Sequence, residues 1–353
     1  MLSTPTFGVL RVIFTVFLIL GGLMILFLMY YKSSPSPKCH PPPTQQPNKP
    51  IVLLWFWPEN KHFDFGDCKK LLNIDSCHLT DDRSLYSKAQ AVLIFHGAIE
   101  DDLSNLPTSP RPGFQRWIWF NMDSPTHTRK IPGIQGLFNL TLSYRKDADV
   151  HVRWRLTVKK RTDEHFVLPK KERLLCWIVG NSDPQKGSGR RYSYYRQLVK
   201  HIKVDVFSRS SARFFKYEDY FLTISSCKFY LSFENSIHKD YITEKLNGPL
   251  AVGTVPIVLG PPRHNYEDFV PGDSFIHVND FLDAQTLAKF LLRLDKDNET
   301  YIRYFDWRKN YSARRHLTGE KHVFTHAVCQ ACAHVGSNKE YRVVPNVYKW
   351  FFG

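Results

Sequence analysis

The fold is decided by residues 227–275, CKFYLSFENSIHKDYITEKLNGPLAVGTVPIVLGPPRHNYEDFVPGDSF. Within this stretch the apolar run Lys228–Phe233 predicts a buried strand, and the polar turn Glu234-Asn235-Ser236 follows it. A helix is expected to open around Tyr241–Lys245, before a second apolar strand at Val255–Leu259. Strand, helix and strand in this order predict a parallel α/β sheet, in which ligands bind outside the carboxyl ends of the strands.

The turn and helix start carry an amide, a hydroxyl, an aromatic ring, a carboxylate and an ammonium group within a short distance. If residues 241–245 form a first helical turn, Tyr241, Glu244 and Lys245 lie on one face of the helix. Helix N-termini attract phosphate, so this composition suits a phosphate-containing ligand. An ordinary βαβ unit with a solvated helix start has the same composition, and composition by itself leaves both interpretations open.

Short apolar runs recur in two series along the rest of the chain, which is typical of buried strands. The runs are Ile51–Trp57, Ala91–Phe95, Trp117–Asn121, Leu174–Val179, Lys203–Phe207, Phe229–Phe233 and Val255–Leu259, and helices are expected at Tyr194–Ile202 and Thr243–Val252. The two series predict an N-terminal α/β domain at 51–170 and a C-terminal α/β domain at 171–353. The cleft between them is the expected site.

Residues 12–31 contain no charged side chain, and about twenty helical residues match the hydrocarbon thickness of a bilayer. A cleaved signal peptide is the alternative, but no Ala-x-Ala-like site follows the run. We expect a short cytoplasmic tail (1–11), a transmembrane signal-anchor (12–31) and a stem (32–50). Seven prolines between Ser33 and Pro50 predict an extended spacer there.

The chain has 353 residues and a formal net charge of +15, so acidic partners have to be considered. Nucleic acid would not meet a lumenal domain, whereas a nucleotide-sugar diphosphate or a sialylated glycan would. A solvated basic face explains the charge equally well. N-glycosylation sequons begin at Asn139, Asn298 and Asn310 and favour the secretory route.

Six of the seven cysteines fall in the globular part, which suits three disulfides in an oxidising compartment and leaves Cys39 in the stem. The six are Cys68, Cys77, Cys176, Cys227, Cys329 and Cys332. A zinc site is the alternative, because His326 and His334 flank the Cys329–Cys332 pair with a spacing that zinc sites use. The oxidising lumen favours disulfides, and spacing does not decide their pairing.

Several strings resemble the alpha-1,3-fucosyltransferases, in the order in which that family has them. SFENS and DYITEK (within 232–245) resemble the family's GDP-fucose site, and the resemblance covers residues 51–352. The other strings are CHLTDDRSLY (77–86), WIWFNMDSPTHT (117–128), LFNLTLSYRKDAD (137–149) and CQAC (329–332).

The resemblance implies a GT-B-like fold of two facing Rossmann-like domains. It implies Cys176–Cys227 within the second half and pairing of Cys68 and Cys77 with Cys329 and Cys332; pairing of neighbours remains open. In the donor site it implies that Arg191 and Lys245 face the diphosphate, that Glu244 takes ribose hydroxyls, and that Asn235 and Tyr241 shape the pocket. The family carries the pair Asp147-x-Asp149 without a metal role, so no obligatory cofactor is expected.

The acceptor side departs from the resembled family. Asp123 stands where the family has a glutamate base, with a side chain one methylene shorter. Pro58-Glu59-Asn60-Lys61 replaces Pro-Phe-Gly-Gln, His96-Gly97-Ala98-Ile99 replaces a His-Arg/Trp-acid motif, and Arg153-Trp154-Arg155 replaces Pro-Tyr-Gly. These changes suggest that GDP-fucose binding is retained while acceptor choice has drifted.

The resulting hypothesis is a Golgi, single-pass type II membrane enzyme with a lumenal catalytic domain. It would move L-fucose from GDP-β-L-fucose to the 3-hydroxyl of N-acetylglucosamine in N-acetyllactosamine-type glycans, with inversion and with Asp123 as the base. A homodimer is compatible with this hypothesis. The alternatives are a catalytically weakened relative that binds nucleotide or glycan, and a fucosyltransferase with another acceptor.

Overall fold

The computed structural model describes residues 7–33, 49–180, 189–208, 219–317, 319 and 322–353. The chain divides into two units, Met1–Asn48 and Lys49–Gly353. In the first unit, helix α1 (Phe7–Ser33) is 27 residues long and includes the predicted segment 12–31. Among the described residues, no helix is both long and apolar enough to cross a membrane. Stem residues 34–48, with Cys39, lie outside the described residues.

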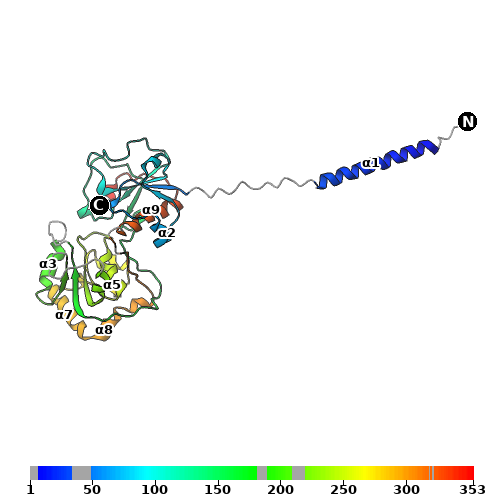
Figure 1. Cartoon of the computed structure of the whole chain (residues 1–353). Helices are drawn as coiled ribbons and strands as arrows, with labels where there is room; N and C mark the ends of the chain where they lie inside the picture. Colours follow the sequence, from blue (N-terminus) through cyan, green and yellow to red (C-terminus); the bar gives the residue numbers. More distant parts are fainter. Residues whose placement is uncertain (1–6, 34–48, 181–188, 209–218, 318, 320–321) are drawn as a thin grey trace. The chain divides into compact units, whose positions relative to one another are not determined.

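The second unit contains two parallel sheets, each with its own core (Figure 1). The first sheet has the strand order β2-β1-β3-β4-β5-β6, and every neighbouring pair is parallel. Its strands are β1 (Ile51–Leu54), β2 (His78–Thr80), β3 (Ala91–Phe95), β4 (Arg116–Phe120), β5 (Leu140–Ser143) and β6 (Val150–His151). Helix α2 (Asp67–Leu72) and the 3₁₀ turns η1 (Pro58–Asn60), η2 (Arg83–Lys88), η3 (His96–Ala98) and η4 (Pro125–His127) connect them.

The second sheet has the order β11-β10-β9-β7-β8 and is also parallel throughout. Its strands are β7 (Arg173–Ile178), β8 (Asp205–Phe207), β9 (Cys227–Phe233), β10 (Val255–Leu259) and β11 (Ile276–His277). The intervening helices are α3 (Gly189–Leu198), α4 (Tyr220–Ser225), α5 (Glu244–Val252), α6 (Arg263–Glu267), α7 (Ala284–Lys296) and α8 (Asn298–Arg303). The 3₁₀ turns η7 (Gly272–Ser274), η8 (Val278–Asp280) and η9 (Asp306–Lys309) complete this half.

The predicted parallel α/β class is therefore confirmed, and two predicted strands, at 91–95 and 255–259, have the expected bounds. The short strands β2, β5, β6 and β11 were not predicted. Each has four residues or fewer, so its apolar run is too short to stand out from the flanking loops.

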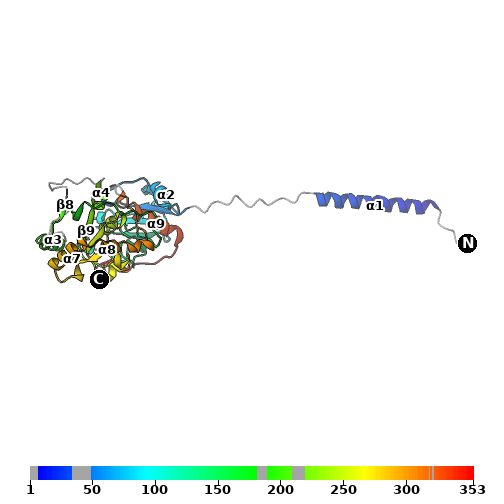
Figure 2. The same cartoon turned by 90° about the horizontal axis from the view of Figure 1, so that it is seen from below.

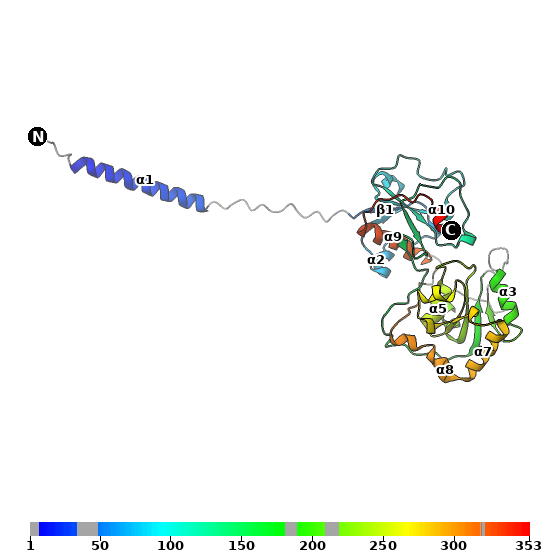
Figure 3. The ribbon, with the colours of Figure 1, turned by 180° about the vertical axis from the view of Figure 1, so that it is seen from behind.

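The chain returns to the first sheet at its end. Helices α9 (Thr325–Ser337) and α10 (Val347–Phe352) pack into the core of the first sheet, and α9 lies beside α2 (Figures 2 and 3). The predicted second domain, 171–353, is therefore wrong at its carboxyl end. The apolar faces of these helices are complementary to a surface that is distant in sequence, and local patterns carry no information on such packing.

Disulfides fix this return. Cys68 pairs with Cys329 and Cys77 pairs with Cys332, which joins the first domain to α9, while Cys176 pairs with Cys227 inside the second sheet. The pairing implied by the family resemblance is confirmed, and pairing of neighbours is excluded. The zinc alternative is excluded for the same reason, because Cys329 and Cys332 have no thiolate left for a metal.

Helix α5 contains a proline in its interior, and a hydrogen bond from the neighbouring sheet compensates for it. Pro249 has no amide hydrogen to give to the carbonyl of Lys245, four residues earlier. The buried hydroxyl of Ser232 on β9 donates to that carbonyl at 2.7 Å instead. An interior proline disfavours a helix, yet α5 runs through Gly248 and Pro249, and a neighbouring strand supplies the missing donor.

Candidate active site

Both sheets have a position at which the direction of strand succession reverses, and ligands bind outside the carboxyl ends of strands at such positions. In the first sheet this position lies between β1 and β3, and in the second it lies between β9 and β7. The segments that leave these four strands carry most of the predicted site residues. The structure therefore places most of the predicted site residues after the carboxyl ends of these strands.

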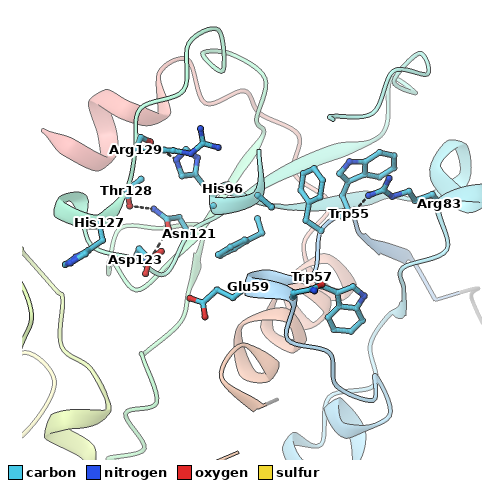
Figure 4. A pocket seen from close by; sticks show the side chains of 15 residues that line it. Trp55, Trp57, Glu59, Arg83, His96, Asn121, Asp123, His127, Thr128 and Arg129 are labelled. Carbon is cyan, nitrogen blue, oxygen red and sulfur yellow. Dashed lines mark hydrogen bonds between the residues drawn. The ribbon is translucent and has the colours of Figure 1, made fainter. Parts of the chain in front are cut away.

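A cavity of about 640 Å³ lies at the carboxyl ends of β1, β3 and β4 (Figure 4). Asp123, Glu59 and His96 line it, together with an aromatic wall of Trp55, Phe56 and Trp57 and with the other residues Asn60, Arg83, Phe95, Gly97, Ala98, Asn121, His127, Thr128 and Arg129. Three of the segments that depart from the resembled family therefore contribute to one cavity.

Asp123, the predicted base, is half-buried in the loop after β4. The side chain of Asn121 accepts a hydrogen bond from the Asp123 amide at 3.1 Å, and Asn121 is itself held by Thr128. Burial raises the pKa of Asp123 to about 6, the negative charge of Glu59 adds to this, and His127 and Lys61 oppose it. The result is a carboxylate that is still ionised near neutral pH but is more basic than an exposed one.

His96 forms part of the cavity wall and is not a base. Its Nδ1 accepts from the indole of Trp119 at 3.1 Å, and its Nε2 lies 2.8 Å from the carbonyl oxygen of Arg129. Burial lowers the pKa of His96 to about 4, so the ring is neutral and donates from Nε2. It therefore joins β3 to the loop that follows Asp123.

Glu59 and Asn60 sit in the left-handed backbone region, with φ of 48° and 57°. Left-handed backbone is uncommon for residues other than glycine and costs free energy, although asparagine tolerates it. Lys61 pairs with the Glu59 carboxylate, and its ammonium group lies over the ring of Phe324. This turn therefore holds a second carboxylate at the cavity of Asp123.

The start of helix α5 carries the predicted donor residues. Thr243 is the N-cap of α5, and the buried carboxylate of Glu234 accepts from its amide at 2.9 Å. The same carboxylate lies 3.3 Å from the ammonium group of Lys245, which also donates to the Thr243 hydroxyl at 2.8 Å. Burial acts to lower the pKa of Lys245, but the negative charges of Glu234 and Glu244 outweigh burial and raise the pKa. Lys245 is therefore positively charged at neutral pH.

Glu244 lies beside Lys245 and is linked to the first domain. The indole of Trp154 donates to its carboxylate at 2.9 Å. Burial acts to raise the pKa of Glu244, but Lys245, Arg155 and His316 overcome it and lower the pKa to about 2. Glu244 is therefore a permanent acceptor, suited to hydroxyl donors. Arg155 keeps a positive φ of 55° at a position where the resembled family has glycine.

Arg191 lies near the start of α3, the helix that follows β7 in the described part of the chain. It is 5% exposed. Burial lowers its pKa, while the charges of Glu234 and Glu244 and the nearby Tyr241 act in the opposite direction. The positive charge of Arg191 in turn acts to lower the pKa of Lys245, so the two cations lie within electrostatic range of each other.

Tyr241 and Asn235 lie in the segment between β9 and α5. Tyr241 is buried and precedes the N-cap, so it is not part of the first helical turn; the prediction that it shares a helix face with Glu244 and Lys245 is wrong. Its ring packs edge-on against Tyr144 of the first half, with centroids 5.0 Å apart. The Asn235 side chain accepts from Ser236 at 3.1 Å in the turn after β9.

The two halves of the site touch. The hydroxyls of Ser124 and Ser236 lie 2.7 Å apart, and the Thr126 hydroxyl lies 2.6 Å from Nε2 of His238. Ser124 follows Asp123 directly, and Ser236 follows Asn235. The loop of the predicted base therefore packs against the turn of the predicted donor site.

Asp147 and Asp149 are occupied by protein partners. Asp147 forms an ion pair with Arg145 at 2.7 Å, and Asp149 accepts from the amide and hydroxyl of Thr141 and pairs with Arg342. These contacts support the structural role expected for the pair. Among the described residues, no group of three or more metal-ligating side chains is found.

The sequons differ in accessibility. Asn298 and Asn310 are exposed. Asn139 is fully buried, and its side-chain amide donates to the carbonyl of Arg342 at 2.6 Å. The burial of this nitrogen does not favour a glycan at Asn139, which stays a prediction from the sequon.

Sequence reasoning omitted Glu59, Glu234 and Arg155 from the site. Glu234 stands inside the SFENS string, which marked it, but its role depends on Thr243 and Lys245 folding back onto it. Glu59 and Arg155 were recognised only as departures from the family. The signal that could have identified them is a charged residue where the resembled family has an aromatic residue (Glu59) or a glycine (Arg155).

Comparisons with known proteins agree on one family. The model "Fucosyltransferase, N-terminal" matches residues 47–155, and "Glycosyltransferase family 10 (fucosyltransferase) C-term" matches residues 168–350. A Mus musculus protein named "4-galactosyl-N-acetylglucosaminide 3-alpha-L-fucosyltransferase 9" is 43% identical over 366 residues, covering 99% of this chain and 100% of its own.

A second relative and a solved structure support the same grouping. The Homo sapiens "4-galactosyl-N-acetylglucosaminide 3-alpha-L-fucosyltransferase FUT5" is 40% identical over 307 residues, covering 85% of this chain and 79% of its own. A structure described as "Crystal Structure of alpha1,3-Fucosyltransferase with GDP-fucose" has a TM-score of 0.52 at 14% identity, covering 84% of this chain and 92% of its own. At that identity the likeness concerns the fold.

Proposed function

The chain belongs to glycosyltransferase family 10, the fucosyltransferases, and we propose that it transfers L-fucose from GDP-β-L-fucose to the 3-hydroxyl of N-acetylglucosamine in N-acetyllactosamine-type glycans. The relatives' names support this acceptor, since they describe a 4-galactosyl-N-acetylglucosaminide. The observation that carries the proposal is the packing of the Asp123 loop against the Asn235–Ser236 turn. This packing supports a site in which the carboxylate of Asp123 acts opposite the cations Arg191 and Lys245.

The donor side suits a nucleoside diphosphate sugar. Arg191 and Lys245 supply fixed positive charge near the N-termini of α3 and α5, where backbone amides also favour anions. Glu244, held ionised by Lys245 and Arg155, accepts hydroxyl donors of the ribose. Asn235 and Tyr241 form the walls of this donor pocket. In this arrangement two domains with Rossmann-like sheets face the ligand, as in a GT-B fold.

The transfer is a single displacement with inversion. Asp123 takes the proton of the acceptor 3-hydroxyl as its oxygen bonds to the anomeric carbon of fucose. The bond from that carbon to the β-phosphate oxygen breaks on the opposite side, and GDP leaves with the electron pair. Arg191 and Lys245 stabilise the charge that develops on the diphosphate. Because the chain supplies these cations itself, we propose that no divalent metal is required.

The test is transfer by the purified chain from GDP-fucose to N-acetyllactosamine, with linkage analysis of the product and with EDTA in a parallel reaction. An α-1,3-linked product that forms equally with and without EDTA supports the proposal. GDP binding by calorimetry is measured on the same preparation. Absence of both product and GDP binding would refute the function, and dependence on added Mn²⁺ would refute metal independence.

A different acceptor is the second candidate, and the composition of the cavity favours testing it. Glu59, Asn60, Lys61 and Ala98 line or flank the cavity at positions where the resembled family has other residues. A panel of neutral, sialylated, lipid-linked and protein-linked lactosamine acceptors separates this candidate from the first. Transfer to another acceptor, with none to lactosamine, would favour it. GDP binding without transfer to any of them would indicate a weakened relative.

We propose that the second unit works in the lumen of the secretory pathway, in the Golgi. Three disulfides and the exposed sequons at Asn298 and Asn310 support an oxidising compartment. Attachment through residues 12–31, in type II orientation, remains a prediction from their composition. Carbonate extraction tests the attachment, and glycosidase digestion of the expressed chain tests the lumenal location; extraction into the soluble fraction would refute the anchor.

A further inference from the structure

The cavity of about 640 Å³ contains two carboxylates from different elements, and the proposed reaction uses only one. Asp123 comes from the loop after β4, whereas Glu59 comes from η1, directly after β1. Figure 4 shows both side chains at this cavity, with Glu59 between Asp123 and Trp57 in the view. The presence of the Glu59 carboxylate at this cavity is therefore not explained by the proposed reaction.

Two features hold Glu59 there. Its backbone is left-handed, which is costly for glutamate, and the following Asn60 is left-handed as well. Lys61 pairs with the carboxylate from the other side of the turn and is itself placed over the Phe324 ring.

We propose that Glu59 is a positioning residue whose negative charge, held at the acceptor cavity by this turn, strengthens Asp123 as the base. The inference rests on the proposed function. Two negative charges that share a partly desolvated cavity repel each other, so Asp123 binds the incoming proton more tightly when Glu59 is ionised. Lys61 limits this repulsion, because its positive charge acts on both carboxylates.

The other groups that face Asp123 do not replace Glu59. His127, on the same loop, acts in the opposite direction, as does Lys61. Tyr144, at the end of β5, and Tyr241, before α5, are neutral, because burial raises the pKa of each hydroxyl above its usual range. Glu59 is thus the carboxylate beside Asp123 that favours proton uptake.

The test compares the pH dependence of kcat/KM in the wild type, Glu59→Gln and Lys61→Gln. Removal of the negative charge moves the acid limb of Glu59→Gln to lower pH by on the order of half a unit. Removal of the positive charge moves the limb of Lys61→Gln to higher pH. If the Glu59–Lys61 pair served only to hold the turn, both variants would shift the profile in the same direction or not at all, and the inference would be wrong.

The height of the profile gives a second readout. A weaker base in Glu59→Gln lowers kcat on the alkaline plateau, by about twofold, while the fraction of active enzyme at pH 5 rises by about the same factor. Glu164→Gln, which removes an exposed carboxylate away from this cavity, is the control and leaves the profile unchanged. A uniform loss at every pH in Glu59→Gln would show misfolding of the cavity and contradict the proposal.

Failure of the proposed function is separable from failure of this inference. The Asp123 carboxyl carbon is followed directly by ¹³C NMR of labelled aspartate, with the signal assigned by its loss in Asp123→Asn. A lower midpoint in Glu59→Gln supports the inference even if no acceptor is converted. An unchanged midpoint in a chain that does transfer fucose overturns the inference and leaves the function intact.

Discussion

Asp123 and Glu59 stand at positions where the resembled family has a glutamate and a phenylalanine, and both now contribute to one cavity. Shortening the base by one methylene moves the carboxylate back, and a misplacement near 1 Å can cost on the order of a hundredfold in rate. A neighbouring carboxylate is proposed to make the shorter base stronger. The two departures are therefore best understood together, as changes to one acid–base environment.

At the residue scale, Asp123→Asn is expected to lower kcat by about 10²- to 10⁴-fold, the usual contribution of a general base. The amide preserves the shape of the side chain but cannot accept the proton. GDP affinity, measured by calorimetry, stays at the wild-type value because Arg191 and Lys245 are untouched. Asp123→Glu is the matched control and retains activity well above that of Asp123→Asn. Equal activity of the wild type and Asp123→Asn would remove Asp123 from the mechanism.

The pH dependence of the wild type follows from the same carboxylate. Its pKa is raised to about 6, chiefly by burial, and only the ionised form can accept a proton. We expect kcat/KM to be constant above this value and to fall as the pH decreases through it, tenfold per unit. The profile is measured at saturating GDP-fucose and low acceptor concentration. An acid limb that remains flat down to pH 4.5 would contradict this assignment.

At the element scale, α5 illustrates how one strand supports a helix that sequence rules disfavour. Ser232 donates to the Lys245 carbonyl that Pro249 leaves without its helical partner. Tyr220 of α4 donates to the neighbouring carbonyl of Glu244 at 3.2 Å. The backbone of the two donor-site residues is thus held from outside the helix, so the position of Lys245 depends on β9 and α4.

Ser232→Ala is expected to lower the free energy of unfolding by about 1–3 kcal/mol, because it leaves a buried carbonyl without a donor. Chemical denaturation monitored by tryptophan fluorescence measures the change. Ser337→Ala is the control: its exposed hydroxyl donates within α9, and its loss has little effect. GDP affinity should fall in Ser232→Ala and stay constant in the control. If Ser232→Ala left the free energy of unfolding unchanged, water or another group would have to donate to the Lys245 carbonyl.

At the scale of the whole molecule, the carboxyl-terminal helices complete the first domain. Phe324, Val328 and Phe351 lie in the same core as β1, β3 and β4. The two disulfides that secure this return span 261 and 255 residues, compared with 51 for the third. Long loops lose the most conformational entropy on closure, so these two bonds are expected to restrain the unfolded chain most.

Replacing Cys329 and Cys332 by Ala, together with Cys68 and Cys77, is expected to destabilise the protein by at least about 2–5 kcal/mol. Replacing Cys176 and Cys227 has a smaller effect, because the loop they close is shorter. Thermal unfolding of both variants measures the difference, and mass spectrometry of non-reduced peptides verifies the pairing. A larger loss from the Cys176–Cys227 variant would show that strain or packing, rather than loop closure, determines these energies.

The sequence by itself determined the parallel α/β class, the main strands and the family. Apolar runs and turn residues are local signals, and the strings around Asp123 and Lys245 identified the family. Only the tertiary structure decided that the last helices belong to the first core, that Asn139 is buried, and that Tyr241 faces Tyr144. It also placed Glu59 at the cavity of Asp123. These features depend on surfaces and charges that meet across distant parts of the chain, and such meetings leave no periodic pattern in the sequence.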